Sequence, residues 1–136
     1  MAEHPFLAAA AEWKTKADGD LRSAQALLDL DPPELDAATY HCQQAAEKYL
    51  KAALVATGAQ PPRTHDLGVL LDLATEPFSQ LGDLREACEY LTPFAVQTRY
   101  PLFAPPISVD DANRALTAST EICEAIQRSI FTAETN

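Results

Sequence analysis

The sequence predicts an all-α protein, an up-and-down helical bundle of four main helices plus one short helix. Apolar residues recur at steps of three and four along separate stretches, which places them on one face of a helix. Prolines interrupt the chain between these stretches. No stretch of the sequence shows the alternating pattern of a strand. Because long helices with short connections pack as antiparallel neighbours, a bundle is the expected architecture.

The first helix is expected over about residues 6–28, where apolar residues follow helical spacing for about six turns. Asp31-Pro32-Pro33 then ends it, because proline disfavours helix in the residue before it. The second helix is expected from about Leu35 to Thr57, entered through Asp36 or a nearby cap. Gly58 follows, where a helix C-terminus favours a left-handed residue. The residues that share one face of this helix, all but one of them small, are Ala38, Cys42, Ala45, Tyr49, Ala52 and Ala56.

The two following helices are expected to be shorter or interrupted. Thr64 is the expected N-cap of a short third helix, which closes at Pro77. A fourth helix starts at about Ser79. Pro93 lies inside its pattern and predicts a kink or a brief break near Thr92. Helical character is expected to return after this break and to continue through Val96.

The last helix is expected to begin at Ser108-x-x-Asp111, which resembles a capping box, and to carry apolar residues to Ile130. A chain of 136 residues is long enough to bury a core. We therefore expect a single domain over residues 1–136, with its core at about 6–130.

Composition narrows the class of protein. The formal net charge of −10 argues against broad binding to nucleic-acid backbone, which needs many lysines and arginines. The three cysteines are widely spaced on apolar helical stripes, so buried free thiols and a reducing cytoplasm are expected. The N-terminus does not resemble a signal peptide, and no run approaches the ~18 apolar residues of a membrane span. The sequence thus predicts a cytoplasmic protein that is not embedded in a membrane.

The sequence lacks the motifs that define several classes of enzyme. It contains no Gly-rich phosphate loop, no Glu-x-x-His pair for a di-iron bundle, no HExxH and no nucleophile elbow. We predict neither a metal site nor a cofactor, and we assign no catalytic residue.

One stretch differs in charge from the acidic remainder. Residues 41–65 hold Lys48, Lys51 and Arg63 against Glu47, so three minus one gives a formal +2. Lysine and arginine can hold a phosphate or carboxylate, and histidine can move a proton near neutral pH. The candidate ligand-binding residues are His41, Gln44, Lys48, Lys51, Arg63, His65, Arg99 and Tyr100.

Each of these candidates also has a simpler interpretation. The two lysines can be ordinary solvated helix residues, and His65 can bond to backbone at the start of the third helix. Arg99 can tie down the proline-rich connector beside it, and His41 can be a surface or dimer-contact residue.

The sequence resembles the HEPN domain (higher eukaryotes and prokaryotes nucleotide-binding) over roughly residues 6–130. The resemblance rests on Trp13 with Asp20-Leu21 and Ala24, on the block HQQAAEK-x-LKA from His41 to Ala52 (one residue separates His41 from Gln43), on Thr64-His65-Asp66-Leu67 and on Thr98-Arg99-Tyr100-Pro101. It implies an up-and-down bundle that is commonly a homodimer. It also implies a link to a small nucleotidyltransferase in toxin–antitoxin or defence systems, and in some members a metal-independent ribonuclease.

The ribonuclease branch of this family uses an arginine followed, after four to six residues, by a histidine near the start of the last long helix. Arg99 is the best positional match, but Ala104, Pro105 and Pro106 occupy the positions of that histidine. No other arginine has a histidine at this spacing. The general acid or base for RNA cleavage is therefore missing from its place, and the interpretation leans away from an enzyme.

Three hypotheses follow. The first is a non-catalytic, homodimeric HEPN binding or partner module that works with a separate nucleotidyltransferase or binds a nucleotide-like anion. The second is a metal-independent ribonuclease that uses His41 or His65 instead of the missing histidine. The third is a purely structural dimeric bundle.

Overall fold

A computed structural model describes residues 6–96 and 105–131 of the chain. Within these ranges it contains five α-helices and no strand, which confirms the predicted all-α bundle. The helices are α1 (Leu7–Leu28), α2 (Leu35–Ala56), α3 (Leu67–Thr75), α4 (Arg85–Leu91) and α5 (Val109–Ile126). The 3₁₀ turns η1 (Ser79–Leu84) and η2 (Thr92–Ala95) flank α4, and the π turn η3 (Gln127–Phe131) extends α5.

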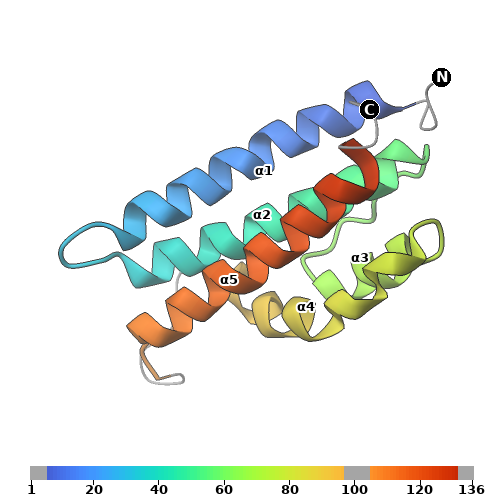
Figure 1. Cartoon of the computed structure of the whole chain (residues 1–136). Helices are drawn as coiled ribbons and strands as arrows, with labels where there is room; N and C mark the ends of the chain where they lie inside the picture. Colours follow the sequence, from blue (N-terminus) through green and yellow to red (C-terminus); the bar gives the residue numbers. More distant parts are fainter. Residues whose placement is uncertain (1–5, 97–104, 132–136) are drawn as a thin grey trace.

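Helix α2 lies at the centre of the bundle (Figure 1). Helix α1 packs along it in the antiparallel direction, and α5 packs against it while running the same way as α2. The shorter helices α3 and α4 cover the remaining side, and α4 also packs on α5. This up-and-down order places one helix, α2, in contact with all the others.

The small face of α2 that the sequence predicts is fully confirmed, because all six of its residues are buried. Helix α1 faces α2 with small residues of its own, Ala10, Ala17 and Ala24. Alanine faces allow close approach of two helices, so that polar side chains at the edge of the contact can bridge them. Leucines such as Leu50 and Leu70 fill the core, each contributing about 2 kcal/mol by burial.

The three cysteines are buried free thiols, as predicted. Burial raises the pKa of both Cys42 and Cys88 to about 12, because the apolar core disfavours the thiolate. They behave as small core residues.

Several local predictions are also confirmed. The hydroxyl of Ser108 accepts from the backbone N–H of Asp111 at 3.0 Å, and the Asp111 carboxylate accepts from the N–H of Ser108 at 3.1 Å. Gly58 has φ of +90°, and a Cβ there would lie 2.6 Å from the Phe6 ring. Only glycine therefore fits both the backbone and the space after α2. The helical path breaks at Pro93, where α4 gives way to η2.

One predicted helix cap is wrong, and another lies at a neighbouring residue. Glu34, two residues before Asp36, occupies the N-cap of α2, and its side chain makes no capping hydrogen bond. Asp66, not Thr64, caps α3: its carboxylate accepts from the N–H of Gly68 at 2.9 Å. A carboxylate at this position satisfies free N–H groups of the first turn.

The fourth helix also differs in detail from the prediction. Its first six residues form the 3₁₀ turn η1, which contains Gly82, a residue that weakens α-helix. After Pro93 the helical character ends at Ala95, and Val96 is extended.

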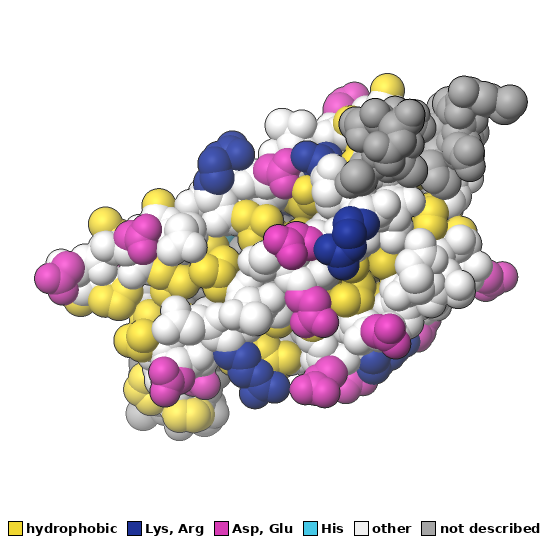
Figure 2. Space-filling view, in the orientation of Figure 1, with side chains coloured by type: hydrophobic (Ala, Val, Ile, Leu, Met, Phe, Trp, Pro, Cys, Tyr) yellow, Lys and Arg dark blue, Asp and Glu magenta, His cyan; other side chains and the backbone are white. Residues whose placement is uncertain are grey.

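No helix within residues 6–96 and 105–131 is both long enough and apolar enough to span a membrane. On the face shown in Figure 2, lysine and arginine side chains lie among acidic ones, with apolar side chains between them.

Candidate functional site

The first part of the candidate site centres on Asp20, a buried carboxylate of α1 that is only 8% exposed. One oxygen contacts Nδ1 of His41 at 2.8 Å, and the other accepts from Nζ of Lys48 at 2.6 Å. The two partners lie on α2 seven residues apart, and so on the same face two turns apart. Asp20 therefore bridges α1 to two turns of α2.

The second part centres on Glu47 of α2, which is 4% exposed. Its oxygens accept from Nζ of Lys51 at 2.9 Å and contact Nδ1 of His65 at 2.8 Å. Nε2 of Gln43 and of Gln44 each donate to Glu47 at 3.3 Å, and Gln44 also donates to Oε1 of Gln43 at 2.8 Å. Four side chains thus surround one buried carboxylate.

The pKa of Glu47 is lowered from its ordinary value. Burial is the largest single influence and raises the pKa, but the hydrogen bonds from His65, Lys51 and Gln43, together with the positive charge of Lys51, outweigh it. Glu47 is therefore a charged carboxylate held in place at neutral pH.

His65 lies in the loop between α2 and α3 and is fixed at two points. Its backbone carbonyl accepts from Nε2 of Gln43 at 3.0 Å, and its ring contacts Glu47 through Nδ1. The side chain is nevertheless 69% exposed. Because an ionised carboxylate only accepts, Nδ1 carries the hydrogen, and Nε2 of the neutral ring bears a lone pair. This arrangement allows His65 to exchange a proton or bind an anion once protonated.

A further pair of contacts extends the seam between α1 and α2. The Asp18 carboxylate accepts from the Tyr49 hydroxyl at 2.6 Å and from Nζ of Lys14 at 2.7 Å. Burial, followed by the bond to Asp18, raises the pKa of Tyr49 well above its usual range, so the phenol stays protonated. The bond between Tyr49 and Asp18 joins α1 to α2, whereas Lys14 and Asp18 both belong to α1. The contacts of Asp20 and those of Glu47 together are called the network of Asp20 and Glu47 below.

The structure places five of the eight sequence-predicted site residues in two sets of contacts: His41 and Lys48 on Asp20, and Gln44, Lys51 and His65 on Glu47. Arg63 is exposed in the loop before His65 and lies outside this set of contacts. Arg99 and Tyr100 lie outside the residues that the structure describes.

Each of the two lysines ends on a buried carboxylate, so neither is an unpaired cation. Lys48 pairs with Asp20 and Lys51 with Glu47, so these four charges cancel. Sequence reasoning missed both carboxylates as site residues. The spacing of four between Glu47 and Lys51 on one helix was a usable signal. No signal in the sequence pointed to Asp20, since only tertiary packing brings it to α2.

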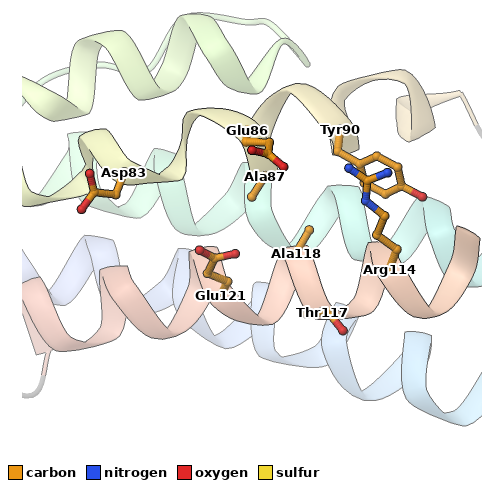
Figure 3. Close-up of a pocket in the computed structure, with 8 residues that line it drawn as sticks. All are labelled: Asp83, Glu86, Ala87, Tyr90, Arg114, Thr117, Ala118 and Glu121. Carbon is orange, nitrogen blue, oxygen red and sulfur yellow. The ribbon is translucent and has the colours of Figure 1, made fainter.

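A separate groove of about 280 Å³ lies between α4 and α5 (Figure 3). Asp83, Glu86 and Glu121 border it, and the Arg114 guanidinium stacks on the Tyr90 ring at 3.9 Å from the centroid. None of the sequence-predicted site residues lines this groove. Nor does the described part of the chain contain a cluster of three side chains suited to holding a metal ion.

Comparison with known proteins gives the family of this fold. The family model for the HEPN domain matches residues 10–129. The chain belongs to the HEPN domain family. The HEPN block at residues 41–52 supplies Glu47, Lys48 and Lys51, and the block at 64–67 supplies His65, so the network is built from the residues that carry the resemblance.

Two solved structures share the HEPN bundle. TT1696 from Thermus thermophilus is 29% identical, with a TM-score of 0.77, over 89% of this chain and 98% of that one. ST0689, an archaeal HEPN homologue, is 22% identical, with a TM-score of 0.69, over 88% and 96% of the two chains, and shows the fold alone. No curated protein matches.

The lowered pKa of Glu47 makes a prediction about stability in acid. A carboxylate whose folded pKa is depressed stabilises the fold above its unfolded pKa, and this contribution is lost as the pH falls through the folded value. We therefore expect the free energy of unfolding to fall with pH below about 4.5, the ordinary pKa of glutamate. Glu47→Gln should be less stable at neutral pH and should lose less stability on acidification.

Urea unfolding at a series of pH values, followed by circular dichroism, measures this slope. Glu34→Gln is the matched control, because Glu34 is exposed and makes no capping bond. An acid slope in Glu47→Gln as steep as in the wild type would contradict the assignment.

Proposed function

We propose that this HEPN protein is a non-catalytic, homodimeric binding or partner module that works with a separately encoded nucleotidyltransferase. Family membership supports the proposal, because HEPN proteins are commonly homodimers that occur with such enzymes. A role in a toxin–antitoxin or defence system and a location in the cytoplasm belong to the same proposal.

We also propose that the module binds a nucleotide-like anion beside the network. The observation that carries this is His65, an exposed imidazole held by a buried carboxylate. An anion competes poorly for Lys48 and Lys51, since each already has a carboxylate partner within 3 Å. Exposed donors are not limited in this way, so we place the anion at His65 and Arg63.

The remaining candidates have supporting parts in this proposal. His41 and Gln44 keep the carboxylates and their partners in place along α2. Arg99 and Tyr100 remain anion contacts predicted from the sequence.

Nucleotide binding predicts a rise in the melting temperature with ATP. A ligand present at ten times its Kd stabilises the fold by about 1.4 kcal/mol, which raises Tm by several degrees in a domain of this size. We expect His65→Gln and Arg63→Gln to remove this rise. Arg22→Gln is the matched control, because Arg22 is an exposed cation on α1. The absence of a shift in the wild type at millimolar ATP would exclude nucleotide binding.

The partner is tested separately by affinity capture from the native cell. We expect a nucleotidyltransferase in the eluate together with a second copy of this chain. A captured set that contains no such enzyme would contradict the partnership and leave the nucleotide test unaffected.

A second candidate function is favoured by the contact between Glu47 and His65. A carboxylate that orients a histidine is the arrangement of a general base, and RNA cleavage needs one. The candidate function is therefore a metal-independent ribonuclease in which His65 replaces the missing family histidine.

This activity would appear as RNA cleavage in the presence of a metal chelator. We expect His65→Gln and Arg99→Ala each to remove it, while Arg22→Gln cleaves like the wild type. RNA that stays intact with the pure wild-type protein would rule the ribonuclease out.

A further inference from the structure

The two histidines of the network have the same kind of partner but different access to solvent. Nδ1 of each ring lies 2.8 Å from a carboxylate oxygen, of Asp20 for His41 and of Glu47 for His65. The His41 side chain is 28% exposed and the His65 side chain 69%. Reagents in solution should therefore reach His65 far more readily than His41.

His65 is also held in one orientation. Glu47 is itself fixed by Lys51 and by the two glutamines, so the oxygen that accepts from Nδ1 does not need to move. The carbonyl of His65 is held by Gln43. A ring fixed at both its backbone and its Nδ1 presents Nε2 outward.

We propose that His65 is a nucleophilic phosphoryl acceptor that reacts at Nε2 with an acyl phosphate or a similar small phosphoryl donor. Histidine is one of the side chains that form covalent intermediates, and a partner that orients it is the usual means of activation. Arg63, an exposed guanidinium two residues earlier in the loop, provides positive charge for the phosphoryl oxygens.

The step balances with acetyl phosphate as the donor. The Nε2 lone pair forms a bond to phosphorus while the bond from phosphorus to the acetate oxygen breaks. Acetate leaves with that electron pair. The hydrogen on Nδ1 stays in its bond to Glu47, and the negative charge of Glu47 offsets the positive charge that the ring acquires.

This inference rests on the proposed anion site, because the phosphate of the donor must first approach the same edge of the loop. The two are separable in the laboratory. A nucleotide that raises Tm without any covalent product would keep the binding function and reject the acceptor. A covalent product on His65, with no rise in Tm on addition of nucleotide, would keep the phosphoryl acceptor and reject nucleotide binding.

The experiment uses the full-length chain, incubated with acetyl phosphate and mapped by peptide mass spectrometry under non-acidic conditions. We expect a single phosphoryl group on the peptide that contains His65 and none on His41. We expect His65→Gln to lose the label and Glu47→Gln to react at least about tenfold more slowly. Glu34→Gln, the matched control, should react at the wild-type rate.

If Glu47→Gln fails to fold, the comparison within the wild-type chain still decides the matter. His65 must then react faster than His41 and His4 in the same molecule. An unlabelled protein, equal rates at the three histidines, or a folded Glu47→Gln that reacts at the wild-type rate would each overturn the proposal.

Discussion

The buried carboxylate of Glu47 is the feature on which the rest of the site depends. Removing a charge from water costs several kcal/mol, and the cost is offset only when nearby donors satisfy the oxygens. Lys51, His65 and two glutamines provide those donors. Because His65 belongs to the loop before α3, the same contacts set the position of that loop on α2. Removing one partner of such a buried pair typically costs about 3–5 kcal/mol.

The alanine packing of α1 on α2 makes the second half of the network possible. With small residues between the helices, a carboxylate as short as Asp20 reaches both a histidine and a lysine across the contact. Larger side chains at Ala17 or Ala45 would separate the helices and open both contacts. The apolar and polar contacts of this interface therefore depend on each other. Close packing brings the charged side chains together, and their ion pairs fix how α1 lies along α2.

The sequence allowed much of this fold to be predicted. Helical periodicity identified each helix from α1 to α5, since it depends only on which residues are apolar. Caps were less predictable: Thr64 and Asp66 are both good N-cap residues two positions apart, and only the packed loop decides between them. The site was found only in part. Five candidates take part in the network because they lie on one face of α2 or in the loop beside it, but the carboxylate partners of Lys48 and Lys51 cancel the charge of the two lysines.

This pairing changes how this surface of the HEPN bundle can work. The paired lysines contribute to structure, and the exposed side chains beside them, above all His65, are the ones that can contact a ligand. A general base and a phosphoryl acceptor require the same state of this ring, with Nδ1–H directed to Glu47 and Nε2 without a hydrogen, facing solvent. Anion binding uses the protonated ring, in which Nε2 also donates.

Nitrogen-15 NMR of the histidine side chains measures that state directly. Above the pH at which the ring loses its extra proton, we expect His65 to show one tautomer, with the hydrogen on Nδ1. Glu47→Gln should convert it to the mixture, rich in the Nε2–H form, that is usual for free histidine. A wild-type His65 that carries its hydrogen on Nε2, or a tautomer unchanged by Glu47→Gln, would contradict the account.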